Sequence, residues 1–350
     1  AQRALSQAQC DRPALVLLFS TIGYDQRVLV DSVRSVTGDA PLCGCSGEGV
    51  IGRDFADESS YSVGVLILAS DELRVVCGVQ SGLATDPAQT GREMGAAIAT
   101  HVQSDTCALL VFPDGLRCNF DRWISGLYEA APTLRSLPLL GGLAGENFKM
   151  GQTFQFCGPN VITDGVVWML LSGALRVAVA VSHGSIPIGE QRQVTACSGN
   201  VIEQIDGQSA LSVLKEYIDE TLMQDWGRAM VPLALGFPAP SHLADDSPLI
   251  LRFSPGRDER TGSITLQTEV SVGQRFWMTR RDPYLIEAGG HGASRKLSSS
   301  LGAQTPKFML HFDCGGRGKL LMREADKLRI LKKLQGCFPP CIPWLGFYTY

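Results

Sequence analysis

The stretch "HFDCGGRG", residues 311–318, places a histidine, an aspartate, a cysteine and an arginine among three glycines. A cysteine at a helix start beside an arginine is a candidate nucleophile, so Cys314 with Arg317 nearby could serve a thiol-dependent enzyme. A Cys–His pair would also need hydrogen-bond contact and an orienting group. The same residues are compatible with a buried structural cysteine, or with a turn after a buried strand, and the sequence leaves these alternatives open.

One pattern occurs three times along the chain: an apolar run, a helical stretch and a Pro-x-x-Gly segment. The apolar runs are "ALVLLF", "ALLVF" and "FMLHF", and the later segments begin at Pro41, Pro138 and Pro343. Continuous apolar runs are typical of strands covered on both faces. The repetition predicts three related units in which Phe19, Phe112 and Phe312 end equivalent strands before a helix.

The first two copies continue with a further pair of apolar segments. Residues 61–82 align with residues 164–184, and the "SDE" and "SG" between their halves are plausible hairpin corners. We therefore expect two strands joined by a tight turn in each of these copies.

Together these patterns predict an α/β (α+β) fold, with mixed β-sheets covered by helices. We expect an internally duplicated N-terminal domain at residues 12–210, with halves at about 12–105 and 106–210. We expect a C-terminal domain at residues 211–350 that contains a related βαβ unit.

The opening stretch belongs to the third copy, at the end of a strand and just before a helix. Ligands of α/β proteins tend to bind at such strand ends. The candidate ligand-binding residues are therefore Cys314, Gly315, Gly316 and Arg317, together with Gly145 and Glu146 of the second copy. We expect Arg317 to face anionic or polar ligand groups, and a turn without a ligand is the alternative.

His183 is the candidate metal ligand. It ends the last strand expected in the second copy, beside Gly184, and its counterpart in the first copy is Ser81. A neutral imidazole is a common ligand for iron as well as for zinc. The alternative is a surface histidine at a strand end.

Composition and motifs narrow the class of function. The net charge of −4 argues against nucleic acid or a membrane as the main partner, and no apolar run is long enough to span a membrane. Eleven scattered cysteines are typical of reduced thiols, so we expect a cytoplasmic location. The glycine-rich "GCSGEG" and "GGLAGEN" lack the Lys-Ser/Thr of a phosphate-binding loop, and no Gly-x-Ser-x-Gly appears. We therefore expect no enzyme.

The chain resembles the FIST family of sensory modules. The resemblance rests on "PLCGCSGEGVIG", "LLGGLAGEN", "DGVVWMLLSG" and "HGSIPIGEQRQVTACSGNVIEQIDGQSAL" for an N-terminal FIST part, and on "FDCGGRG" and "PWLGFYTY" for a C-terminal part. It implies a small-ligand sensor that acts on a partner histidine kinase or cyclic-di-GMP signalling protein, and it leaves a homodimer open.

One branch of the family comprises nitric-oxide-sensing haemoproteins, and this branch gives the leading hypothesis. It implies haem as cofactor, with His183 as axial ligand, His311 as its rival and the run Trp168–Leu171 as an apolar wall. The alternatives are a sensor of a non-haem metabolite such as an amino acid, and a thiol-dependent enzyme that uses Cys314.

Overall fold

The computed structural model describes residues 1–149, 151–240 and 247–350, and contacts divide the chain into two compact units. The first unit contains residues 1–178, 304–318 and 339–350, and the second contains residues 179–303 and 319–338. The predicted division at residue 210 follows the order of the chain and stays a prediction.

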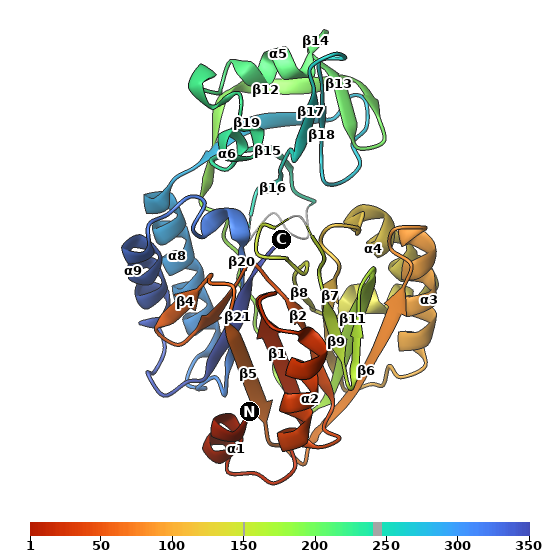
Figure 1. Ribbon diagram of the computed structural model, residues 1–350, viewed down its shortest axis with the longest axis vertical. Coiled ribbons are helices and arrows are strands. Elements are labelled where there is room, and N and C mark those ends of the chain that lie inside the picture. The colour runs from red at the N-terminus through yellow and green to blue at the C-terminus, as the bar shows by residue number, and fades with distance from the viewer. Residues whose placement is uncertain (150, 241–246) are drawn as a thin grey trace. The chain divides into compact units, whose positions relative to one another are not determined.

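The chain contains three β–α–β copies whose two strands pair in parallel (Figure 1). All six of these strands lie in the first unit, whereas the helix of the third copy belongs to the second unit. The first copy consists of β1 (Leu15–Ser20), α2 (Gln26–Thr37) and β2 (Leu42–Ser46). The second consists of β7 (Thr106–Pro113), α4 (Phe120–Ala130), η1 (Pro132–Ser136) and β8 (Leu139–Gly141). The third consists of β20 (Met309–Cys314), η3 (Gly315–Arg317), α9 (Glu324–Gln335) and β21 (Trp344–Thr349).

The predicted equivalence of the three phenylalanines is confirmed. In each copy the residue before the phenylalanine is paired with the glycine of Pro-x-x-Gly. The rings of Phe19, Phe112 and Phe312 meet in one cluster, with centroids 5.2, 6.1 and 6.0 Å apart. Aromatic pairs at such separations add attraction to their burial, so the cluster binds the three copies together.

The glycines of the three Pro-x-x-Gly segments are required by close backbone contact. A Cβ atom at Gly44, Gly141 or Gly346 would overlap the carbonyl oxygen of its partner residue on the neighbouring parallel strand. The same steric requirement in each copy explains why the sequence repeats a glycine there.

Three main-chain hydrogen bonds join the copies in a ring just beyond these glycines. In each bond the donor is the N–H of the residue four positions after the Pro-x-x-Gly glycine of one copy. The acceptor is the carbonyl of the residue two positions after the corresponding glycine of another copy. The bonds are Glu48 to Tyr348 (2.8 Å), Gly145 to Ser46 (2.9 Å) and Tyr350 to Leu143 (3.0 Å). The first copy thus bonds to the third, the second to the first, and the third to the second.

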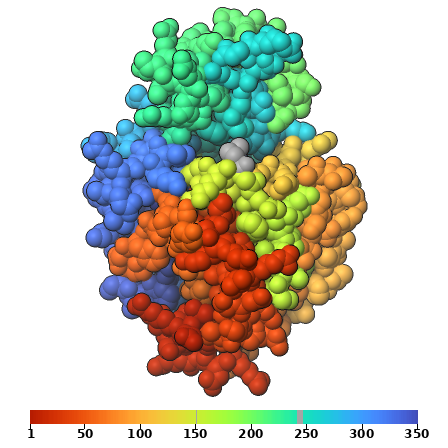
Figure 2. All heavy atoms as spheres, in the orientation of Figure 1, coloured from red at the N-terminus to blue at the C-terminus, as the bar shows by residue number. Residues whose placement is uncertain are grey.

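The copies also exchange strands. The first sheet has the order β10-β9-β2-β1-β5, the second β6-β11-β7-β8 and the third β20-β21-β3-β4. Thus β3 (Gly49–Gly52) and β4 (Phe55–Asp57) leave the first copy to extend the third sheet. Likewise β9 (Gln155–Cys157) and β10 (Asn160–Ile162) leave the second copy to extend the first sheet. Figure 2 shows yellow-green atoms of the second copy directly against red atoms of the first.

The predicted hairpins of the first two copies are wrong. In the first copy, β5 (Val63–Leu68) pairs with β1, whereas β6 (Leu73–Ser81) crosses to pair with β11 (Gly165–Gly173) along nine residues. In the second copy, residues 174–184 form no strand. The reason is that β11 already has β6 and β7 as its two neighbours, so the following segment has no free edge of this sheet.

Side-chain caps set the starts of the helices in the first unit. Asp25 accepts from the main chain of Arg27 and Val28 at the start of α2, and Asn119 accepts from Arg122 at α4. Asp86 caps α3 (Pro87–Ala99), which packs closely on α4 beside the second sheet in Figure 1. The short α1 (Gln2–Ala8) contributes Leu5 and neighbouring apolar side chains to the core around β1.

The second unit contains a largely antiparallel sheet. Its main order is β16-β15-β19-β12-β13-β18-β17, with β14 paired to β13. The strands are β12 (Ser185–Ser198), β13 (Val201–Ile205), β14 (Gln208–Ser209), β15 (Leu233–Pro238), β16 (Leu249–Arg252), β17 (Gly256–Asp258), β18 (Ser263–Thr265) and β19 (Arg275–Arg281). The helical elements are α5 (Ala210–Lys215), η2 (Glu220–Leu222), α6 (Trp226–Met230), α8 (Pro283–Leu301) and α9.

Two apolar clusters hold this unit. Phe276 and Met278 of β19 are fully buried with Leu214 of α5 and Met230 of α6. Helices α8 and α9 pack on each other through Ile286, Ile330 and Leu334, among others. The structure therefore confirms the predicted α/β class, with mixed sheets and helices. The βαβ unit that was predicted in the C-terminal domain is present, but its two strands lie in the first unit.

Replacing Gly346 with alanine should lower the free energy of unfolding by about 3 kcal/mol, because the new Cβ would overlap the carbonyl of His311 and push β20 and β21 apart. The control is Gly151→Ala, where no atom lies within 4 Å of the added Cβ and the change should stay within about 0.5 kcal/mol. Denaturant unfolding measures both, and equal stabilities of the two variants would contradict the close-contact argument.

Candidate functional site

The ends of the central strands of the first unit bring several acidic side chains together. Glu48 follows β2 and is fully buried, and its Oε1 accepts from the main-chain N–H of Glu146 at 3.1 Å. Asn147 Nδ2 donates to the carbonyl oxygens of Glu48 at 2.9 Å and Glu58 at 3.1 Å. A Cβ at Gly145 would overlap the carboxylate of Glu48, so the glycine is what lets that carboxylate lie against the second copy.

Glu146 is the most unusual group of this cluster. Its side chain is fully buried, and its Oε2 accepts from the main-chain N–H of Gly151 at a long 3.4 Å. Its Oε1 is buried and has no hydrogen-bond partner among the described residues. Buried polar atoms are nearly always hydrogen-bonded, so an oxygen in this state indicates a place where a ligand donor can bind.

Tyr350 shows how close the carboxylates lie to one another. Burial raises the pKa of its phenol, and the negative charges of Glu146, Glu48 and Asp114 raise it further. One hydroxyl thus lies in the field of three carboxylates that come from the first and second copies. We call Glu48, Glu146, Asp114 and Tyr350 the strand-end site.

Asp114, a third carboxylate of the site, is paired with a cation. Its Oδ2 accepts from Arg117 Nη1 at 2.9 Å and from the main chain of Asp164 at 3.1 Å. Its Oδ1 accepts from the main-chain N–H groups of Leu116 and Arg117. Asp114 therefore has a structural role that fixes the turn after β7, and it leaves little capacity for a ligand.

The third copy repeats this arrangement one residue earlier. Arg317 is 8% exposed, and its Nε lies 3.0 Å from Asp313 Oδ1. Asp313 also accepts from the main-chain N–H of Cys314 at 2.8 Å. The guanidinium of Arg317 thus has a structural partner in the carboxylate of Asp313. The predicted contact of Arg317 with an anionic ligand stays a prediction.

The structure brings together only part of the predicted ligand set. Gly145 and Glu146 lie in the strand-end site, and Gly315 reaches it, since a Cβ there would lie 2.9 Å from Glu48 Cγ. Cys314 is exposed, and Gly316 belongs to the same short turn η3.

Sequence reasoning missed three members of the site. Glu48 could have been found, because "SGEG" and "AGEN" place the same Gly-Glu pair after β2 and β8. Asp114 and Tyr350 gave no such signal, since they reach the site through contacts between copies.

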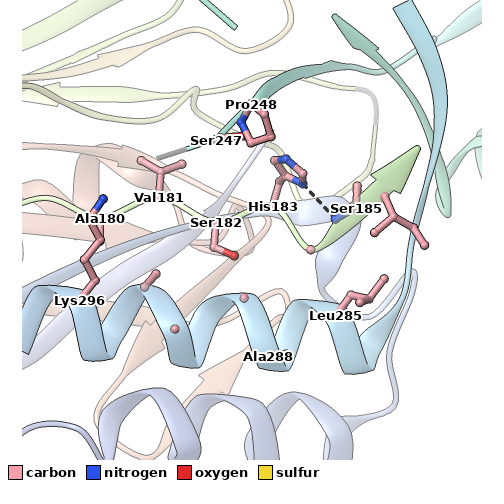
Figure 3. Close-up of a pocket in the computed structure, with 15 residues that line it drawn as sticks. Ala180, Val181, Ser182, His183, Ser185, Ser247, Pro248, Leu285, Ala288 and Lys296 are labelled. Carbon is pink, nitrogen blue, oxygen red and sulfur yellow. Dashed lines mark hydrogen bonds between the residues drawn. The ribbon is translucent and has the colours of Figure 1, made fainter. Parts of the chain in front are cut away.

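His183 lies in the second unit, in the wall of a pocket of about 400 Å³. Figure 3 shows the imidazole near Ser247 and Pro248, opposite helix α8, whose small residues Ala288, Gly289, Gly292 and Ala293 line the other side. The imidazole Nδ1 accepts from the main-chain N–H of Ser185 at 2.9 Å, so in a neutral ring the proton is on Nε2. The predicted apolar wall Trp168–Leu171 is buried within β11 of the first unit and does not line this pocket.

His311, the rival histidine, lies in β20 with its side chain 17% exposed. Burial lowers its pKa and the charge of Asp313 partly offsets this effect. Its ring lies edge-on to Trp344, at a centroid distance of 6.0 Å. These contacts describe a neutral imidazole within the apolar packing of the third sheet.

The molecule is an α/β protein with a buried acidic site at the ends of its repeated parallel strands. Proteins of this class commonly bind small molecules at such strand ends. Comparison with protein families gives a FIST N domain at residues 14–208 and a FIST C domain at residues 210–350. The chain belongs to the FIST family. FIST domains are associated with signal transduction and with the sensing of small ligands.

The chain is similar to several uncharacterized proteins. One from Mycobacterium tuberculosis is 28% identical over 346 residues, which cover 96% of this chain and 85% of the relative. One from Mycobacterium bovis is 28% identical over 366 residues, which cover all of this chain and 88% of the relative. One from Methanocaldococcus jannaschii is 27% identical over 185 residues, half of this chain and 35% of the relative.

Within residues 1–149, 151–240 and 247–350, no helix is long and apolar enough to cross a membrane. The same ranges hold no group of three His, Cys, Asp or Glu side chains placed to bind a metal ion.

Replacing Arg317 with alanine should lower the free energy of unfolding by about 3 kcal/mol, because it leaves the largely buried Asp313, 13% exposed, without its cation. Arg74→Ala is a matched control, since Arg74 and Asp105 form a comparable but exposed pair whose loss should cost less than about 1 kcal/mol. Thermal melts should be run beside a ligand titration. A variant as stable as the wild type that loses ligand binding would instead assign Arg317 to the ligand.

Proposed function

We propose that this protein is a small-ligand sensor whose ligand presents an amino group to the strand-end site. The observation that carries the proposal is the carboxylate of Glu146, fully buried with one oxygen that has no partner among the described residues. Burying such a group is costly when it is charged and unpaired, so a bound cation would stabilise it.

The chemistry of the site favours a cationic group over an anionic one. The arginines that follow β7 and β20 are already paired, Arg117 with Asp114 and Arg317 with Asp313. An ammonium group has three donors and no acceptor, which suits carboxylate oxygens as neighbours. Among small metabolites, an amino acid or another primary amine has this group.

The place of the strand-end site at the junction of the three copies supports a sensing role. Glu48 and Gly145 are members of the main-chain ring that joins the three copies, and Glu146 is the next residue along the chain. A ligand that binds Glu146 therefore contacts the junction between the copies. If the ligand binds one arrangement of this junction more tightly than another, it increases the population of the arrangement that it prefers. We propose binding and no catalytic step, with a histidine kinase or cyclic-di-GMP protein as the partner that responds.

A primary amine of the right shape should raise the midpoint of thermal unfolding of the wild-type protein. At a concentration one hundred times its Kd, a ligand that binds only the native state adds about 2.7 kcal/mol. Glu146→Gln should lose this stabilisation while folding at least as well as wild type, because it removes a buried charge. The control variant is Glu72→Gln on the exposed loop before β6.

The ligand itself supplies a second control. The N-acetylated form of each amine keeps its shape but has no positive charge, so it should give no shift. Equal shifts with amine and N-acetyl amine, or a full shift in Glu146→Gln, would contradict the proposal.

Nitric oxide sensing through haem is the second candidate, favoured by the position of His183 in a pocket wall. Val181, Ile186 and Leu285 give the pocket apolar lining, which suits the apolar faces of a haem. The hydrogen bond from Ser185 fits it less well, because it leaves the proton on Nε2, the atom that points away from the main chain. His183 would have to exchange tautomers and give up this bond before Nε2 could bind iron, and haem would then supply the nitric oxide chemistry.

Haem reconstitution of the wild type, His183→Ala and His101→Ala tests this candidate. If His183 is the ligand, its replacement should shift the Soret band and lower haem retention after desalting, whereas the exposed His101 should matter little. Unchanged spectra in His183→Ala exclude this residue, and a wild-type protein that retains no haem excludes the candidate.

A further inference from the structure

The pocket beside His183 has the features of a ligand site that needs no iron. Its volume is about 400 Å³, and all of its described lining residues belong to the second unit. One side is formed by residues 180–186, which lead into β12 and which we call the wall segment. The other side is one face of α8 (Figure 3). The two sides of the pocket therefore belong to one compact part of the chain.

Two glycines let the wall segment lie directly on α8. A Cβ atom at Gly289 would be 2.5 Å from Ser182 Oγ, and a Cβ atom at Gly184 would be 2.5 Å from the Cα of Ile286. At Gly292, about one turn further along α8, no atom of the described residues lies within 4 Å of an added Cβ. The wall segment and the helix are thus packed together at Gly289, and open space begins at Gly292.

Ser185 supplies a polar group that the described protein does not use. This residue lines the pocket and is 8% exposed, and its Oγ has no hydrogen-bond partner among the described residues. Buried polar atoms are nearly always hydrogen-bonded, so the hydroxyl indicates a place where a ligand atom can bind. The main-chain N–H of Ser185 donates to His183 Nδ1, so both residues lie at the same end of the pocket (Figure 3).

The other polar groups of the pocket favour a ligand with negative charge. A neutral imidazole of His183 has its proton on Nε2 and therefore presents a donor. Lys296 is the one Lys, Arg, Asp or Glu among the described residues that line the pocket. A carboxylate has acceptors only, so it complements a hydroxyl, an imidazole N–H and an ammonium group.

The remaining lining is apolar. Val181 and Ile186 are 54% and 43% exposed, although both are large apolar side chains, and both line this pocket. Leu285, Ala288 and Ala293 of α8 line it as well. An apolar ligand group that covers these side chains would remove them from water, which favours binding.

We propose that this pocket binds an amphipathic carboxylate, a small molecule with one carboxylate group and an apolar body. The carboxylate accepts hydrogen bonds from the Ser185 hydroxyl and the His183 imidazole, and the apolar body lies along α8 at Gly292. Lys296 adds positive charge to the pocket. The same Nε2 atom of His183 cannot donate to a carboxylate and bind haem iron, so the two occupants exclude each other.

Such a ligand would be a second input to the protein. It would hold the wall segment, and with it the start of β12, against α8 in the second unit. The strand-end site lies in the first unit and is acidic, so the two sites differ in position and in the charge that they select.

Decanoate is the probe, and isothermal titration calorimetry with the full chain measures its binding. Decylamine has the same apolar body with the opposite charge, so we expect it to bind more weakly than decanoate. Ser185→Ala should weaken decanoate binding by about tenfold, because it removes a hydrogen bond to a charged group. The same variant should melt at the wild-type temperature or above, since its hydroxyl has no partner to lose among the described residues.

Gly292→Leu tests the location. The new side chain should fill the open space and abolish decanoate binding, while leucine is a better helix former than glycine and should preserve the fold. Ser299→Leu is the matched control, because it adds a leucine at an exposed position of α8 that does not line the pocket. This control should bind decanoate like the wild type.

Glu146→Gln separates this proposal from that for the strand-end site, since it should bind decanoate with wild-type affinity. Loss of decanoate binding in Glu146→Gln would place the probe in the first unit and overturn the inference. Wild-type affinity in Gly292→Leu or in Ser185→Ala would overturn it too. So would equal affinities for decanoate and decylamine, or a wild-type protein that does not bind decanoate.

Discussion

The ring of three main-chain hydrogen bonds at the ends of β2, β8 and β21 is the constraint on which the first unit depends. Each bond joins a different pair of copies, so removing any copy breaks two of the three. The bonds follow the strands that pair with β1, β7 and β20, and these carry the phenylalanines of the cluster. The bonds and the cluster together fix where each strand ends. A carboxylate that follows such a strand is therefore placed by all three copies at once.

The exchange of strands between sheets makes this constraint cooperative. β3 and β4 extend the sheet of the third copy, while β9 and β10 extend that of the first. No copy can complete its sheet from its own residues, and contacts between residues more than two hundred positions apart, such as Gly52 with Leu345, are part of the sheet pairing itself. Long-range pairing of this kind slows folding, but it also couples the copies mechanically.

The sequence was informative where a signal is local. Apolar runs and Pro-x-x-Gly segments are short, and the steric need for Gly44, Gly141 and Gly346 arises at the same place in each copy, so the three related units could be predicted. Strand partners could not, since the residues of β6 alternate in the same way whether they fold back on β5 or cross to β11. The ion pair of Arg317 with Asp313 lay within the opening stretch itself, yet only the backbone path of η3 shows that the two side chains meet.

The chemistry of the strand-end site arises from the way in which the three copies differ. At the equivalent ring position the first copy has Glu48, the second Gly145 and the third Tyr350. The glycine makes room for the carboxylate of Glu48, and the second copy then adds Glu146 one residue later. The third copy contributes a phenol in place of a carboxylate, and its arginine is held by Asp313. A symmetric ring would hold three equal charges that repel one another. This one brings two carboxylates and a phenol together, so the field at the site is negative, and the proposed preference for a cationic group rests on the divergence of the copies.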